Sequence, residues 1–451
     1  MKPRSHYLTS NFVLFSIVAM GLMISPFVIS TSSGFFLANT QSARVNLPIR
    51  SFPDPDIQAF GHYGQSVATS PGNLMVVGSA NQTVDGLVGA GQVYTFNTKL
   101  GTLFSNLSSA NPQAFGHFGR AVAISPACDG KPCRSIWVNS WCLLDACTLV
   151  VGAANETVDG IVGAGHAYIF NTNTSAVART LASPNAQYEG QFGWSVTVGG
   201  SLVIVGAPNE TVDGNVGAGR AYVFDALNGK VITTLTSPSP QTNGRFGESV
   251  GMSDNSRAST NLVIVGAPGQ TVNGSLGAGQ AYVFDPKTGV LISTLSSPNA
   301  QSNGWFGWSV SLTYNIVAAG APKETSGAFS LAGNAYGFVA TTGKLLYALK
   351  DPNPQRGGAF GWSVWLSAQT AGVGAPGEKV NGTADAGQAY TFGDQTGALI
   401  STYASLHPQA DGSFGYSVTV VQNPGPHGYI IGIGAPDEST SGYIQSGNLY
   451  V

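Results

Sequence analysis

The chain has 451 residues, of which 43% are hydrophobic and only 9% are charged, so it can bury a large core and is not intrinsically disordered. The formal net charge is −3, without a dense cluster of Lys or Arg. DNA and RNA are therefore excluded as main partners, because binding to phosphates needs a basic patch. The 60 glycines, between short runs of Val, Ile, Tyr and Phe, indicate an all-β chain with many turns.

The N-terminal segment carries an export pattern. Lys2 and Arg4 precede an apolar run from Phe12 to Ile29, and Gln41-Ser42-Ala43 offers a small-residue cleavage site. We expect residues 1–43 to be a signal peptide, with an N-terminal membrane anchor through residues 12–29 as the alternative. In either case the positive flank stays inside, and residues 44–451 lie outside the cytoplasmic membrane, secreted or at the cell surface.

Glycosylation acceptors agree with export. The pattern Asn-x-Ser/Thr occurs seven times, and each copy is a glycosylation candidate in a host that modifies its exported proteins. The acceptors are Asn81, Asn106, Asn155, Asn173, Asn209, Asn273 and Asn381.

A repeated segment, Phe-Gly-x-Ser-Val and its variants, divides the exported part of the chain. The glycines of the seven copies are separated by 55, 74, 54, 60, 54 and 54 positions, so the underlying period is 54. The two longer gaps contain a cysteine-bearing insertion and a polar stretch from Ser253 to Thr260, and we expect both between the same two strands of their repeats. The seven units start near residues 60, 115, 191, 245, 305, 359 and 413.

Each repeat predicts four short strands. In the third copy these are Ser195–Val198, Leu202–Gly206, Gly219–Asp225 and Lys230–Thr236, separated by turn residues. Seven repeats of four strands predict an all-β, seven-bladed β-propeller with four antiparallel strands per blade.

The last repeat lacks its fourth strand. Its strands are expected at Tyr416–Val420, Tyr429–Gly434 and Gly447–Val451, where the chain stops. Val45–Phe52, followed by Pro53, resembles a fourth strand and stands before the first repeat. We therefore expect an N-terminal strand to complete the last blade and close the ring.

The four cysteines lie within one short stretch of the second repeat. The residue numbers of Cys128 with Cys147, and of Cys133 with Cys142, add to the same total, as facing residues of one antiparallel hairpin require. Two nested disulfides are the pairing that this spacing favours. Bridges from Cys128 to Cys133 and from Cys142 to Cys147 are the alternative pairing, and a four-cysteine zinc site is the alternative chemistry.

The repeats resemble a known family. A later Gly-Ala-Pro, as at Gly206–Pro208 and Gly266–Pro268, completes the pattern of the FG-GAP repeat found in integrin α chains, and the resemblance covers residues 44–451. That family often carries an Asp-rich calcium loop between the first and second strands. The corresponding connections here, such as Gly199-Gly200 and Thr313–Asn315, hold no run of carboxylates, so we expect no calcium and no cofactor.

The resemblance also implies a ligand-binding face formed by the connections between the second and third strands. The recurring sequence motif Asn-Glu/Gln-Thr-Val-Asp-Gly and its relatives provide five candidate ligand-face residues. The alternative interpretation is that these residues only form the turn. These residues are Asp85, Asp159, Asp213, Asn273 and Asn381.

Large aromatic residues follow the Phe-Gly pair in four repeats. Trp194, Trp308, Trp362 and Tyr416 could form a ring that stacks on sugars, but we expect them to pack between blades.

No catalytic constellation is visible. The chain has only 22 Asp and Glu residues, many of them in repeated turns, and its six histidines show no metal-ligand spacing. We expect a non-catalytic binding or adhesion protein whose partner is an extracellular protein or glycan. The alternatives are a propeller enzyme acting on polysaccharide, as a hydrolase or lyase, and a self-associating structural protein of the cell envelope.

Overall fold

The computed structural model describes residues 49–71, 73–125, 127–128, 131–132, 148–253, 261–367, 369–422 and 428–451. It divides the chain into residues 1–43 and 44–451, and the described residues belong to the second unit. Within them the regular elements are all strands, and none of these residues lies in a helix that could cross a membrane.

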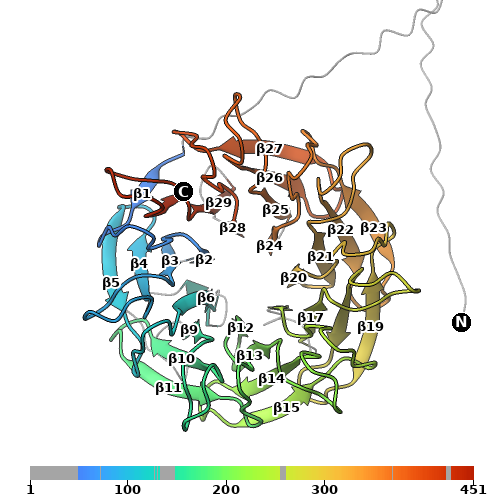
Figure 1. Ribbon diagram of the computed structural model, residues 1–451, viewed down its shortest axis with the longest axis horizontal. Helices are drawn as coiled ribbons and strands as arrows, with labels where there is room; N and C mark the ends of the chain where they lie inside the picture. The colour runs from blue at the N-terminus through green and yellow to red at the C-terminus, as the bar shows by residue number, and fades with distance from the viewer. Residues whose placement is uncertain are drawn as a thin grey trace, which may run out of the picture. The chain divides into compact units, whose positions relative to one another are not determined.

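Seven four-stranded antiparallel sheets surround a common axis as blades (Figure 1). The first strand of each blade is innermost. Blades 1 to 3 contain β2 (Ser66–Ser70), β3 (Leu74–Ser79), β4 (Gln92–Asn97) and β5 (Thr102–Leu107); β6 (Phe118–Ile124), β9 (Thr148–Ala153), β10 (His166–Asn171) and β11 (Val177–Ala182); and β12 (Ser195–Gly199), β13 (Leu202–Ala207), β14 (Arg220–Asp225) and β15 (Val231–Leu235).

The same order continues around the ring. Blades 4 to 7 contain β16 (Ser249–Met252), β17 (Val263–Ala267), β18 (Gln280–Phe284) and β19 (Leu291–Ser296); β20 (Ser309–Thr313), β21 (Ile316–Ala321), β22 (Asn334–Val339) and β23 (Leu345–Leu349); β24 (Ser363–Ser367), β25 (Thr370–Ala375), β26 (Gln388–Gly393) and β27 (Leu399–Ala404); and β28 (Ser417–Gln422), β29 (Tyr429–Ala435), β30 (Asn448–Tyr450) and β1 (Ser51–Pro53). The predicted seven-bladed, four-stranded architecture is confirmed, and the strand ends predicted for the third repeat differ from the observed ones by at most one residue.

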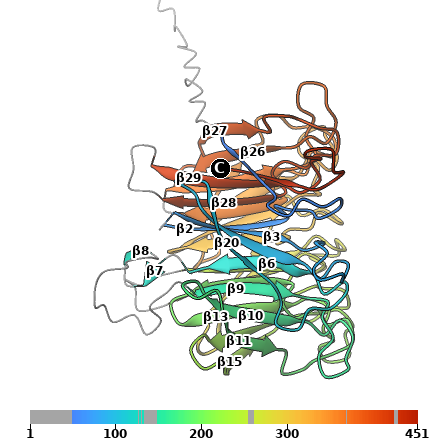
Figure 2. The same cartoon turned by 90° about the vertical axis from the view of Figure 1, so that its left-hand side faces the viewer.

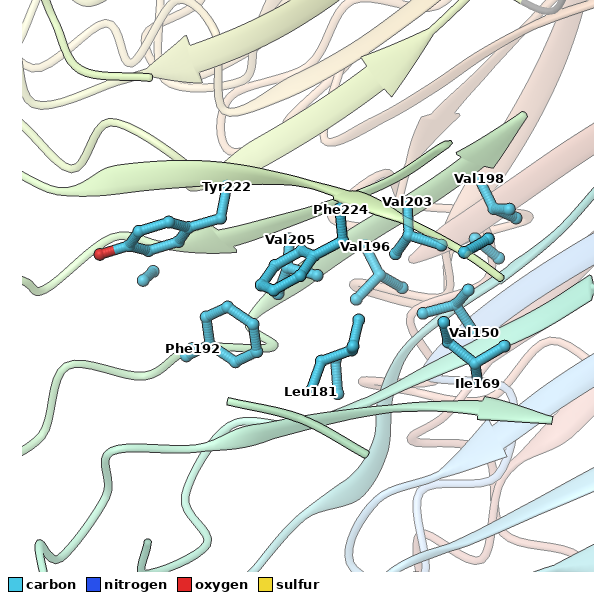
Figure 3. Close-up of a cluster of buried hydrophobic side chains, with 14 residues drawn as sticks. Val150, Ile169, Leu181, Phe192, Val196, Val198, Val203, Val205, Tyr222 and Phe224 are labelled. Carbon is cyan, nitrogen blue, oxygen red and sulfur yellow. The ribbon is translucent and has the colours of Figure 1, made fainter. Parts of the chain in front are cut away.

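The core lies between neighbouring blades. The six residues of β13 are all buried, whereas β15 on the outside buries only its last residue completely. Figure 3 shows Phe192, Tyr222 and Phe224 of blade 3 packed in one cluster with Leu181 and Ile169 of blade 2. A middle strand whose two faces are both covered by neighbouring blades needs consecutive apolar residues, which explains the sequence Leu-Val-Ile-Val in β13.

An N-terminal strand closes the ring, as predicted. β1 pairs antiparallel with β30, and the backbone N–H and C=O groups of Arg50 and Val451 exchange two further hydrogen bonds of 2.8 Å. The predicted bounds are corrected, because β1 covers Ser51–Pro53 and so includes Pro53; residues 45–48 of the predicted strand lie outside the described residues. Pro53 is tolerated because β1 is the outermost strand of its blade.

The two ends of the blades differ. The connections between second and third strands, and those from one blade to the next, share one end of the strands, which we call the loop face. Figure 2 shows long connections at this end and the short strands β7 (Ala127–Cys128) and β8 (Lys131–Pro132) at the opposite end. Both insertions fall between first and second strands, β6 to β9 and β16 to β17, as the repeat predicted.

The cysteine pairing stays a prediction. The backbone of Cys128 is paired with Lys131 in the β7 to β8 hairpin. Its side chain and the residues Cys133, Cys142 and Cys147 lie outside what the structure describes, so neither the nested disulfides nor the alternatives are tested.

Candidate ligand-binding site on the loop face

The five predicted ligand-face residues are exposed at the tips of separate turns. Each has φ between 48° and 51° and is followed by a glycine whose φ lies between 80° and 90°. Positive φ at both central residues defines the type I′ turn, for which Asp-Gly and Asn-Gly are the preferred pairs. Turn formation therefore accounts for these residues: Asp85, Asp159, Asp213, Asn273 and Asn381.

A second set of loop-face residues comes together around the axis. Each follows the glycine of Phe-Gly or, in blade 1, Tyr-Gly, and it immediately precedes the innermost strand in six blades and lies within β6 in blade 2. Adjacent innermost strands are in contact all around the ring. All are half-buried except one Glu, which is buried. We call this set the axial cluster, and its members are Gln65, Arg120, Trp194, Glu248, Trp308, Trp362 and Tyr416.

Aromatic rings form one side of the axial cluster. Trp308 lies 4.9 Å from Trp362, and Trp362 lies 5.5 Å from Tyr416, measured between ring centroids. Trp305 extends this arc, since its ring stacks on Trp308 at 4.9 Å, and the Lys323 ammonium lies 3.4 Å from the Trp305 centroid. We expected these aromatic residues to pack between blades. They pack on one another, and each keeps part of its surface exposed to solvent.

Charged residues form the other side. The Arg120 guanidinium carbon lies 3.5 Å from the ring centroid of Trp194. Trp194 Nε1 donates a hydrogen bond of 3.0 Å to Glu248 Oε1, while Arg245 donates from Nε to Glu248 Oε2 over 2.7 Å. Both carboxylate oxygens of Glu248 are thus engaged by residues other than Arg120.

Arg120 is left without a hydrogen-bonding partner for its guanidinium. Its Nε is buried, and within the described part of the chain the side chain forms neither a hydrogen bond nor an ion pair of contact length. Burial lowers the pKa of Arg120, although the charges of Tyr416 and Glu248 act in the opposite direction. A cation in this setting is stabilised by the Trp194 ring and retains hydrogen-bonding capacity.

The axial cluster is also where the repeats differ in chemistry. The glycine before this position is present in all seven copies, whereas the position itself holds Gln, Arg, Glu, Tyr and three Trp. The repeated residues build the same backbone in each blade, and the varied ones place unlike side chains around one axis. A symmetric scaffold therefore presents an asymmetric surface.

Sequence reasoning missed a buried polar cluster that recurs near the loop face. In blade 3, Glu210 is fully buried and accepts hydrogen bonds of 2.5 Å from Tyr222 of the same blade and from Ser183, which follows the last strand of blade 2. Burial raises the pKa of the Glu210 carboxyl. The recurrence of Glu or Gln after Gly-Ala-Pro was the available signal. Equivalent positions are Gln82, Glu156, Gln270, Glu324, Glu378 and Glu438.

The glycosylation candidates are not equally accessible. Asn106, Asn173, Asn273 and Asn381 are exposed, whereas Asn81, Asn155 and Asn209 are half-buried. Asn155 and Asn209 also hydrogen-bond through their side-chain amides to Gln191. An N-linked glycan attaches to Nδ2, which is the atom that Asn209 uses as donor, whereas Asn155 accepts through Oδ1.

Among the described residues, no group of three or more His, Cys, Asp and Glu side chains has the arrangement of a metal site.

Comparison with known proteins agrees with this architecture. Residues 176–224 match the family described as FG-GAP repeat. The matched segment runs from the last strand of blade 2 through the first three strands of blade 3, so the sequence unit is offset from the blade by one strand. No curated protein matches the chain. The chain is thus a seven-bladed β-propeller that contains a segment matching the FG-GAP repeat.

Proposed function

We propose that this chain is an exported, non-catalytic binding protein that presents its loop face to a protein or glycan outside the cytoplasmic membrane. The proposal rests chiefly on the axial cluster, which gathers aromatic, cationic and amide side chains at one place on a repeated scaffold. Half-buried aromatic residues beside polar groups are typical of binding sites, because they supply rigid apolar area at a small loss of side-chain entropy.

The turns around the axial cluster support the same role. They are held by type I′ geometry and by buried Glu-Tyr-Ser contacts between blades, so the loop face is stiff before any ligand arrives. A preorganised surface loses little conformational entropy on binding. The export signal, either cleaved or retained as an anchor, would place this surface outside the cell.

The test uses the full chain on protein and glycan arrays, together with a screen for polysaccharide hydrolase and lyase activity. Saturable binding without turnover is expected, and Trp308→Ala should weaken it at least about tenfold if the loop face is responsible. Tyr314→Ala is the matched control, because Tyr314 is exposed between β20 and β21 at the opposite end of blade 5.

Two results would contradict the proposal. Reproducible turnover of a polysaccharide would favour the enzyme alternative. Concentration-dependent self-association, without an array ligand, would favour the structural alternative.

A further inference from the structure

We propose that the axial cluster binds a saccharide containing a uronic acid, with Arg120 receiving the carboxylate and Trp308 and Trp362 stacking on the sugar rings. This inference rests on the proposed binding function and names its ligand class. It is carried by two hydrogen-bonding atoms that lack partners and by the arc of aromatic rings beside them.

The first atom is a donor. Arg120 Nε is buried and unpartnered, while the guanidinium lies against the Trp194 ring at 3.5 Å. The N–H groups of a guanidinium lie in its plane, so stacking on a ring leaves them directed at the edges. A carboxylate matches them, because its two oxygens accept a pair of parallel hydrogen bonds.

The nearby carboxylate of Glu248 does not serve as the hydrogen-bonding partner of Arg120. Glu248 is occupied by Trp194 and by Arg245, whose Nη2 lies 2.6 Å from Glu248 Oε2. A buried N–H group without a partner, such as that of Arg120 Nε, is costly, and a ligand anion beside the guanidinium lowers that cost on binding.

The second atom is an acceptor. Among the described residues, Gln65 Oε1 is also buried without a hydrogen-bonding partner. A sugar hydroxyl is a donor that would satisfy Gln65. A uronic acid carries hydroxyls and a carboxylate on one ring, so a single residue of the ligand supplies both missing partners.

The aromatic arc begins beside these two residues. Tyr416 precedes β28 and Gln65 precedes β2, two innermost strands that are in contact, and the arc then runs through Trp362 and Trp308 to Trp305. Pyranose rings present faces of C–H groups that pack on aromatic rings. Several adjacent rings favour an oligosaccharide over a single sugar.

The far end of the arc carries a second cation, since Lys323 lies over Trp305. Cations thus stand at both ends of an apolar platform, an arrangement that matches a chain of sugars with repeated negative charges. An acidic peptide would satisfy the cations but gains less from the flat rings, so the saccharide is favoured.

The experiment measures binding of the full chain to a panel of linear oligosaccharides of galacturonic, glucuronic, mannuronic and guluronic acid by calorimetry and tryptophan fluorescence. At least one should bind saturably, and its methyl-esterified form, which keeps the sugar rings but loses the charge, should bind about tenfold or more weakly. Arg120→Met should weaken binding of the acid about tenfold and Arg120→Lys less, because Lys keeps the charge without the paired geometry.

Arg179→Met provides the matched control, since Arg179 is exposed on β11 at the outside of blade 2. Melting temperatures check that each variant folds, and Trp308→Ala tests the aromatic arc independently of Arg120.

Three results would each overturn the inference: binding of poly-glutamate in place of every uronate, equal binding of the acid and its ester, or failure of the whole panel to bind. An array ligand whose binding needs Trp308 but not Arg120 would leave the proposed function standing, whereas absence of any ligand would remove both.

Discussion

Asp351 stands where five other blades have a serine in the buried polar cluster, and it therefore meets Glu378 as a second carboxyl group. Burial and then the charge of Asp351 raise the pKa of Glu378 to about 9. Asp351 Oδ2 and Glu378 Oε1 both lack partners, and a proton held between them would satisfy both oxygens. The equivalent position after the last strand of blade 7 also holds an acid, Asp54, but the blade 1 residue equivalent to Glu378 is the amide Gln82.

The carboxyl pair predicts a fall in stability as pH rises. The folded chain holds the Glu378 proton up to about pH 9, whereas the unfolded chain releases it near the ordinary glutamate pKa of 4.5. Folding therefore takes up a proton between these values, and the free energy of unfolding decreases as pH increases. Asp351→Ser removes the repulsion and should raise the melting temperature at pH 8 by on the order of 3 °C, with a smaller gain at pH 5.

Asp54→Ser serves as the control for that titration. Burial, with a smaller contribution from the charge of Asp56, raises the pKa of Asp54 to about 6, so its effect on the melting temperature should level off above about pH 6. Equal gains for Asp351→Ser at pH 5 and pH 8 would show that the carboxyl pair does not titrate in this range.

At the scale of elements, two glycines explain how neighbouring blades meet. A Cβ on Gly206, in the Gly-Ala-Pro of blade 3, would lie 2.1 Å from the carbonyl oxygen of Gly247, in the Phe-Gly of blade 4. The same carbonyl accepts a hydrogen bond of 2.8 Å from Ser195 Oγ. The repeated Phe-Gly and Gly-Ala-Pro motifs thus supply the two glycines at this close backbone contact. The serine hydroxyl adds a hydrogen bond from one blade to the next.

Gly206→Ala should therefore destabilise the protein strongly, because the blades must separate or distort to admit the new methyl group. We expect a loss of about 3 kcal/mol in the free energy of unfolding, measured by denaturant titration. Gly200→Ala is the comparison, since Gly200 has φ of +56° and open space around its Cβ, so only backbone strain of about 1 kcal/mol is added. Similar losses in the two variants would argue against the contact.

The sequence predicted the elements well and their contacts around the axis poorly. Strands such as β13 were predictable because their apolar runs and bounding turns are local. The axial cluster was not, because Arg120, Trp194 and Glu248 belong to blades 2, 3 and 4 and come together only once the sheets curve around a ring. The buried contacts of Glu210 were not predictable either, because its partners Tyr222 and Ser183 lie 12 and 27 positions away in the sequence.

At the scale of the whole molecule, the ring depends on a very short closing strand. Within β1, Phe52 is 4% exposed and packs edge-on against Phe96 of blade 1 at 5.9 Å, so one side chain links the last blade to the first. The closing strand therefore contributes apolar burial as well as three paired residues.

Phe52→Ala should cost about 3–5 kcal/mol in the free energy of unfolding, because it opens a cavity at the seam. Val231→Ala is the matched change on another outermost strand, where the side chain is 40% exposed, and it should cost less than about 1 kcal/mol. Denaturant titration of both variants makes the comparison, and comparable losses would mean that the seam is not a point of weakness.

The backbone bonds between Arg50 and Val451 have a consequence for how the protein can be rewired. Joining these neighbouring residues with a short linker, and cutting the chain in an exposed turn such as the one at Gly274, would give a circular permutant with the same seven sheets. Its blade order along the gene would change while every inter-blade surface stayed intact. In such a permutant a different blade would be encoded first, although the order of the blades around the ring would be unchanged.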